Sequence, residues 1–261
     1  MVIPFDPIIL WTDAFIYLLI GIIITISSYV RRHPHLVAPW RRVTHSASGM
    51  SAFTILVFFV SIGILDTIHF RPAIESSSSE TNTKTFSVEV LSLLDVIAAP
   101  LRINVEKTYS APLSAYLYAK ETIELPDGEQ VREFTRLTFG GAHLVNPETD
   151  RLQDIIMRSI KGAGWGLFAW SIIIFSVTLW LAYQNKIRYW QTQRTLWLGQ
   201  TETPWWAIFI TLNVIILLSG AVIALATHYH VLGTDKVGQD VLYLSLKSIR
   251  TGLVIGTLTT L

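Results

Sequence analysis

The 261-residue sequence has no cysteine and little charge: 15% of its residues are Asp, Glu, Lys or Arg, against about 25% in an average soluble domain. The lack of cysteine excludes disulfides, thiolate zinc sites, iron–sulfur clusters and cysteine nucleophiles. Twenty basic residues against nineteen acidic ones leave no electrostatic footprint for binding nucleic acid. The G-x-x-x-x-G-K-[ST], H-E-x-x-H and G-x-S-x-G motifs are also missing. We therefore predict no catalytic residue, no cofactor and no nucleic-acid partner.

What the sequence does contain is long apolar runs. Hydrophobic residues make up 51% of the chain, and its mean hydropathy is +0.46. A bilayer-crossing helix needs about 20 predominantly apolar residues, and four runs are long enough: residues 8–30, 46–65, 162–183 and 203–227. A fifth run, residues 251–261, stops at about half that length. These runs predict an α-helical integral membrane protein with four full transmembrane helices and a truncated fifth.

Orientation follows from the Lys and Arg residues of the short loops, which are enriched on the cytoplasmic side. Such residues gather in the loop after the first run and in the loop after the third: Arg31, Arg32, Arg41 and Arg42, then Lys186, Arg188 and Arg194. We expect both loops to be cytoplasmic, which places the N-terminus, residues 66–161 and residues 228–250 outside. Lys236, Lys247 and Arg250 count against this topology. Inside the third run, Trp170 and Trp180 are expected to pack against other helices.

The segment from 71 to 161 has the composition of a water-exposed α+β module. Ser76 to Ser79 read as a flexible connector, and period-two alternation predicts strands at 86–90, 101–105, 120–125 and 130–139. The last two are joined by Pro126-Asp127-Gly128-Glu129 into a hairpin. Asn146 and Pro147 fit the start of a helix that leads into the third run. This module is interpreted as a spacer or docking surface, or alternatively as a ligand sensor.

A few polar residues stand out as candidates for chemistry. His228 and His230, with Asp235 nearby, are the one grouping that suggests a metal, but the spacing places no third ligand. We therefore interpret both histidines as interfacial and predict no metal site, and we interpret His33, His35 and His45 as solvated loop residues. Asp13 and Asp66 lie at the outer ends of the first two runs and can reach the membrane interface, with a proton relay as the alternative.

The most informative segment joins the fourth run to the partial fifth and reads L-G-T-D-K-V-G-Q-D-V-L over residues 232–242. Gly233 and Gly238 allow backbone conformations that other residues avoid, and Asp235 can accept backbone hydrogen bonds in an Asx turn. Asp240 is placed to cap a helix whose apolar residues recur at helical spacing. On these grounds alone, the segment also fits a well-capped turn that only returns the chain to the membrane.

The segment resembles the L-G-T-D-x-x-G-R-D-[VL]-[LF] signature of the dipeptide/oligopeptide/nickel family of ABC transporter permeases, in its C-type branch. The matching residues are Leu232, Gly233, Thr234, Asp235, Gly238, Asp240, Val241 and Leu242. Gln239 stands where the family has Arg. Of the family's following G-A-R-x-S-L-x-x-G pattern, Arg250, Leu253 and Gly256 are kept. The resemblance covers residues 192–261, so the preceding part would be an N-terminal extension.

This resemblance implies a membrane-spanning permease subunit of a binding-protein-dependent ABC importer, for peptides, in the bacterial inner (plasma) membrane. It implies a second permease subunit, two cytoplasmic ATPase subunits that would hydrolyse ATP, and an extracytoplasmic solute-binding protein as partners, besides the lipid bilayer. The family's motif lies on the extracytoplasmic side, as the charge count predicts here. Its ATPase-docking helix lies beyond the last residue of this chain, so we expect a truncated or split permease.

The expected segments are a two-helix membrane extension (1–70), the extracytoplasmic module (71–161), the third helix with its cytoplasmic loop (162–202) and the start of the permease domain (203–261). The alternative is a membrane-anchored extracytoplasmic sensor or docking protein, suggested by a module held between two helices. Its inner loops, residues 31–45 and 184–202, are short for a signalling domain. An intramembrane enzyme is the third and least supported hypothesis.

Overall fold

The computed structural model describes residues 5–74, 85–124 and 130–260. The predicted connector at Ser76 to Ser79, the turn at Pro126 to Glu129 and the last residue of the fifth run lie outside the described residues. The chain divides into two compact units. Unit 1 comprises Met1–Pro39, Val57–Ala99 and Ser245–Leu261, and unit 2 comprises Trp40–Leu56 and Pro100–Leu244. The two units are defined by how compactly their residues pack, and they do not test the four segments expected from sequence, which stay a prediction.

Among the described residues, four helices are long and apolar enough to cross a membrane, as predicted from the four runs. They are α1 (Trp11–Arg31), α3 (Ala47–Thr67), α6 (Pro147–Asn185) and α8 (Trp205–Ala226). Large apolar side chains on them face outward, with Phe15 61% exposed and Leu218 63% exposed. Such surfaces are compatible with a hydrocarbon environment and indicate a membrane protein. The partial fifth run belongs to one continuous helix, α9 (Val241–Thr260).

Two helices occupy segments that sequence reasoning had treated as loops. They are α2 (Pro34–His45) and α7 (Tyr189–Trp197). Proline suits the first position of a helix, where its missing N–H leaves no bond unmade, and Pro34 opens α2 in this way. His35 and His45 are exposed as expected, but they lie on α2 and not in a loop.

Unit 1 contains a small antiparallel sheet built around β2 (His69–Ile74). This strand directly follows α3 and pairs with β1 (Phe5–Ile8), which precedes α1, through the register Ile8 to His69. It also pairs with β3 (Thr85–Phe86) and β4 (Leu91–Ser92). The predicted strand at 86–90 is therefore wrong beyond Phe86. The short helix α4 (Leu93–Ile97) follows β4 with a capping box formed by Ser92 and Asp95.

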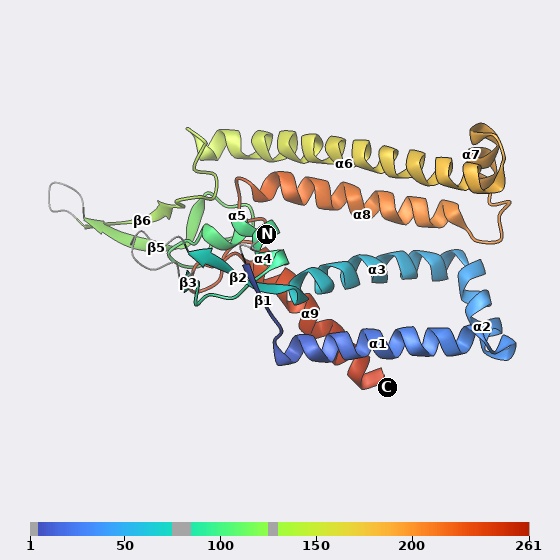
Figure 1. The fold of residues 1–261 in the computed structure, drawn as a ribbon. Coiled ribbons are helices and arrows are strands. Elements are labelled where there is room, and N and C mark those ends of the chain that lie inside the picture. Colours follow the sequence, from blue (N-terminus) through green and yellow to red (C-terminus); the bar gives the residue numbers. More distant parts are fainter. Residues whose placement is uncertain (1–4, 75–84, 125–129, 261) are drawn as a thin grey trace. The chain divides into compact units, whose positions relative to one another are not determined.

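Unit 2 contains the antiparallel helix pair α6 and α8, which run side by side in Figure 1. Gly162 and Gly166 of α6 meet Gly220 of α8, and a Cβ added at Gly220 would lie 2.5 Å from the Gly162 carbonyl oxygen. The absence of side chains here lets the two backbones approach closely. The helix α7 lies at one end of this pair. At the opposite end project β5 (Tyr116–Glu124) and β6 (Gln130–Arg136), which form the predicted hairpin.

Three local predictions in unit 2 need correction. Residues 101–105 are not a strand, because Pro100 lies in the first turn of the helix α5 (Ala99–Ile103), and Ile103 is 68% exposed. The helix α6 starts after Asn146 as predicted, but the Asn146 side chain makes no capping hydrogen bond. Trp170 packs as predicted and donates Nε1–H to the Phe209 carbonyl oxygen at 3.0 Å. Trp180 does not pack against another helix as predicted, since it is 55% exposed.

Candidate functional site

The turn between α8 and α9, residues 227–240, contains the glycine–aspartate segment singled out by sequence. Gly233 and Gly238 have φ values of +78° and +77°, in the left-handed region that disfavours residues with a Cβ. A Cβ at Gly233 would lie 2.3 Å from the Ser110 carbonyl oxygen, and one at Gly238 would lie 1.7 Å from the Glu106 carbonyl oxygen. Both positions therefore require glycine for two reasons, the backbone angle and the neighbouring chain.

The two aspartates of the turn act as predicted. Asp235 Oδ1 accepts hydrogen bonds from the backbone N–H of Val237 and of Gln239, both at 2.9 Å, which forms an Asx turn. Asp240 Oδ1 accepts from the N–H of Leu242 at 2.8 Å and of Tyr243 at 3.3 Å, so it caps α9. Each acidic residue thus satisfies donors that the bent backbone would otherwise leave free.

The segment before the hairpin holds this turn from the other side. Thr234 donates its hydroxyl to the Thr108 carbonyl oxygen at 2.8 Å and lies 3.0 Å from Ser110 Oγ. The backbone N–H of Glu106 donates to the Gly238 carbonyl oxygen at 2.9 Å. Residues more than 120 positions apart in the chain therefore fix the shape of the turn.

Glu106 is the residue that ties the turn to the hairpin, and sequence reasoning missed it. Its buried carboxylate accepts bonds from the N–H groups of Thr138, Phe139 and Gly140 and from the Thr138 hydroxyl, at 2.8 to 3.3 Å. Burial alone raises the pKa of Glu106, but these hydrogen bonds outweigh burial and lower the pKa below its ordinary value. A single acid in a loop segment of sequence gave no signal of this role.

His230 lies between Glu106 and Asp240 and is only 1% exposed. Its Nδ1 lies 2.7 Å from Asp240 Oδ2, and its Nε2 lies 3.5 Å from Glu106 Oε1. Because a carboxylate only accepts hydrogen bonds, Nδ1 carries a proton. His230 is therefore a buried structural residue, and its interpretation as an interfacial histidine is wrong.

His228 belongs to a second, half-buried cluster at the same end of the α6–α8 pair. Arg158 Nη1 lies 3.0 Å from His228 Nδ1, and its Nε donates to Asp154 at 2.7 Å. Asp154 also accepts from the Tyr229 hydroxyl at 2.8 Å and lies 2.8 Å from His143 Nε2. Burial, the charge of Arg158 and that of His143 lower the pKa of His228, so the neutral imidazole is favoured.

The exposed side of the turn is formed by side chains that take no part in the hydrogen bonds described above. Leu232 is 45% exposed and Val237 is 57% exposed, and Lys236 and Gln239 are also exposed. Of the predicted motif residues, Leu232, Gly233, Thr234, Asp235, Gly238 and Asp240 come together in unit 2. Arg250 belongs to unit 1.

Arg250 is part of a charged network inside unit 1, called here the Asp13 network. Its members are Asp13, Asp66, His69, Ser92, Asp95, Lys247 and Arg250. Asp13 and Asp66 have no exposed surface, which corrects the expectation that they reach the membrane interface. The network joins the start of α1, the end of α3, the sheet with α4, and α9.

The contacts of the Asp13 network alternate in charge. Asp13 lies 2.8 Å from His69 Nδ1 and 3.1 Å from Arg250 Nη1. Arg250 Nε lies 3.2 Å from Asp66 Oδ2. Lys247 Nζ then lies 3.0 Å from Asp66 and 2.8 Å from Asp95. Burying carboxylates this deeply is tolerable only when each is paired with a cation and hydrogen-bonded.

The network contains three acidic residues, Asp13, Asp66 and Asp95, and two basic ones, Lys247 and Arg250. His69 Nδ1 also lies 3.2 Å from the Thr67 carbonyl oxygen, so both of its neighbours are acceptors and Nδ1 carries a proton.

In the described part of the chain, no group of three or more His, Cys, Asp or Glu side chains is arranged to hold a metal ion. The arrangement suits electrostatic cross-linking of helices more than ligand binding.

Comparison with protein-family models, with curated proteins and with solved structures found no match for this chain. Its likeness to ABC transporter permeases therefore depends on residues 232–242 and the pattern that follows them.

Proposed function

We propose that this chain is a membrane-spanning permease subunit of a binding-protein-dependent ABC importer, with the turn at 227–240 on the extracytoplasmic side of the bacterial inner membrane. The solute is a peptide or a small molecule of similar size. ATP hydrolysis belongs to separate cytoplasmic subunits, and a second permease subunit completes the translocation pathway.

One observation carries this proposal: the residue types of the motif are those that the turn between α8 and α9 needs. Gly233 and Gly238 adopt left-handed backbone angles against neighbouring chain, and Asp235 and Asp240 accept the backbone donors that the turn leaves free. A chance match of sequence letters would not have to satisfy these requirements. The same turn leaves Leu232, Lys236 and Val237 exposed to a partner or solute.

The proposed orientation is tested by thiol labelling in intact cells. The sequence has no cysteine, so Lys236→Cys and Arg41→Cys each introduce a unique thiol at an exposed position. A membrane-impermeant maleimide is expected to label the cysteine at position 236 in intact cells and the one at position 41 only after permeabilisation. The reverse pattern would contradict the proposed topology.

The proposed function is tested by purification of the tagged chain from its native membrane in a mild detergent. We expect ATPase subunits and a second permease subunit to co-purify in stoichiometric amounts. Recovery of a signalling partner without an ATPase would instead support the membrane-anchored sensor. The variant Gly238→Val, which cannot adopt the turn, should lose these partners while Gly164→Val, at a helix position open to space, should keep them.

A further inference from the structure

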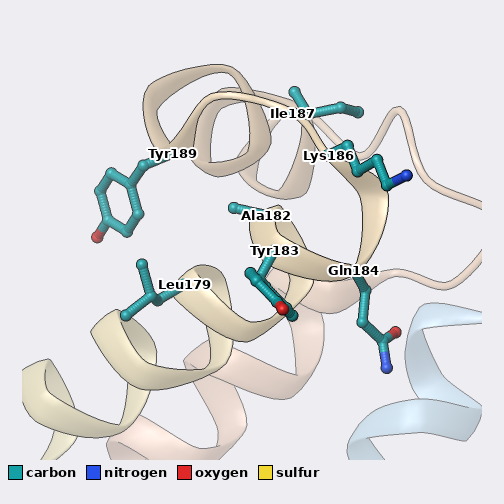
Figure 2. Close-up of a pocket in the computed structure, with 7 residues that line it drawn as sticks. All are labelled: Leu179, Ala182, Tyr183, Gln184, Lys186, Ile187 and Tyr189. Atoms are coloured by element: carbon teal, nitrogen blue, oxygen red, sulfur yellow. The ribbon is translucent and has the colours of Figure 1, made fainter.

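A cavity of about 590 Å³ lies where α6 ends and α7 begins. Leu179 and Ala182 of α6, with Ile187 of the connecting turn, give it an apolar lining, and Tyr183 and Tyr189 add two aromatic rings. Figure 2 shows the side chains of Leu179 and Tyr189 facing one another from the two helices, with Lys186 on the turn between them. The lining is thus mainly apolar and aromatic, and Lys186 is its one cation, with a side chain that extends away from Leu179 and Tyr189 in Figure 2.

A second cavity of about 460 Å³ shares the lining residue Tyr189 with the first. Its α6 side is lined by Phe168, Ile172 and Phe175, which with Leu179 are spaced four, three and four residues apart and so share one helix face. These four side chains are 50 to 59% exposed. They extend over roughly 16 Å of helix rise, about half of the ~30 Å hydrocarbon core. The length of the groove therefore matches one leaflet.

The charged residues of the chain segment that forms this groove are all basic. Lys186, Arg188 and Arg194 lie on or beside α7, and the sequence has no Asp or Glu between Asp154 and Glu202. The buried amide oxygen of Gln193, which lines the second cavity, accepts no hydrogen bond from any residue that the structure describes. The first cavity therefore offers the cation Lys186 to an anionic group, and the second offers an acceptor, Gln193, to a hydroxyl.

We propose that this groove binds one anionic phospholipid, with its phosphate at Lys186 and one acyl chain along Phe168, Ile172, Phe175 and Leu179. A soluble phosphate compound would use Lys186 but not the apolar groove, and a neutral lipid would use only the groove. The phospholipid uses both. This proposal depends on insertion of the chain into a membrane and not on its being an importer subunit, so each can fail without the other.

The test is native mass spectrometry of the full-length chain in detergent, with phosphatidylglycerol as the anionic probe and phosphatidylcholine of the same chains as the neutral one. We expect one molecule of phosphatidylglycerol to be retained at least about fivefold more strongly than phosphatidylcholine, since one cation near an anionic headgroup has about this effect. Lys186→Gln should abolish this preference. Leu179→Trp, which fills the groove, should weaken binding of both lipids.

Arg194→Gln is the matched control, because Arg194 is an exposed cation on α7 that lines neither cavity. It should change phosphatidylglycerol binding less than twofold. Equal losses in Lys186→Gln and Arg194→Gln would mean diffuse attraction and would overturn the site. Displacement of the lipid by glycerol 3-phosphate, or unchanged binding in Leu179→Trp, would overturn the role of the groove. Thermal unfolding of each variant checks that it is folded. Because Lys186 is exposed, we expect Lys186→Gln to fold like the wild type.

Discussion

Glu106 shows how one buried carboxylate can organise three parts of unit 2. Its carboxylate accepts the hydrogen bonds of residues 138–140, its backbone N–H donates to Gly238, and His230 faces it. A buried ionised acid is stable when several donors surround it, and its removal leaves those donors unpaired. The stability of the turn should therefore depend on the charge of Glu106.

This dependence has a definite pH sign. The pKa of Glu106 is lowered from its ordinary value of 4.5 in the folded chain, so the unfolded chain binds a proton first as the pH falls. Its contribution to the free energy of unfolding is fully present above about pH 4.5 and is lost as the pH falls through the lowered pKa. We expect Glu106→Gln to lower the free energy of unfolding by about 2–4 kcal/mol at pH 7, and by progressively less below pH 4.5.

The measurement is unfolding of the wild type and of Glu106→Gln at a series of pH values. Glu121→Gln is the control, because Glu121 is on the hairpin and its ion-pair partner Lys107 is 72% exposed, so its effect at pH 7 should be small. A pH-independent difference between the wild type and Glu106→Gln would show that the carboxylate charge is not what stabilises the turn.

At the residue scale, the sequence predicted what depends on local backbone chemistry. The left-handed glycines, the Asx turn of Asp235 and the capping by Asp240 involve bonds within a few residues, so residue type and spacing were enough. Glu106 and His230 could not be predicted this way. Their partners lie 32 and 10 positions away, and only the folded chain brings them together.

Among the elements, the pair α6 and α8 depends on the small size of three residues. Gly162 and Gly166 face Gly220, and added Cβ atoms at Gly162 and Gly220 would lie 2.3 and 2.5 Å from carbonyl oxygens of the other helix. In a membrane, association of helices comes largely from close packing of this kind, since lipid is as apolar as the side chains. A larger side chain must push the two backbones apart.

We therefore expect Gly220→Val to lower the free energy of unfolding by about 1–3 kcal/mol. Gly164→Val is the matched control, because Gly164 lies on α6 two residues from Gly162 and has no atom within 4 Å of its Cβ position. Its effect should stay within about 0.5–1 kcal/mol. Unfolding by titration with a denaturing detergent measures both. Equal effects of the two substitutions would show that glycine matters for helix propensity and not for packing.

The four apolar helices could be predicted because length and composition alone identify them. The helices α2 and α7 could not, since their short polar sequences resemble loops and only 9 to 12 residues are involved. The alternation of apolar residues at 101–105 led to a wrong strand prediction for a related reason. A period of two in three apolar residues is a weak signal, and the proline at position 100 favours the first turn of a helix.

For the chain as a whole, the Asp13 network brings residues of its first hundred positions together with residues near its end. Asp13 and Arg250 are 237 positions apart, so nothing in the sequence pattern pairs them. The sequence did show isolated acids at the ends of two apolar runs and two cations three residues apart near the fifth. Because ionised side chains are rare in such segments without a partner, acids and cations of this kind can be expected to pair.

The last prediction is that Asp13 and Arg250 are energetically coupled. Arg250→Gln leaves Asp13 buried without its guanidinium partner, so it should lower the free energy of unfolding by about 3–5 kcal/mol. Asp13→Asn should also destabilise, but the double variant should be less destabilised than the sum of the two by about 0.5–3 kcal/mol. The control cycle uses Arg41→Gln and Glu202→Gln, whose ion pair is 3.6 Å long with side chains 65% and 77% exposed. Exposed pairs couple by less than about 1 kcal/mol, so equal coupling in the two cycles would contradict the buried network.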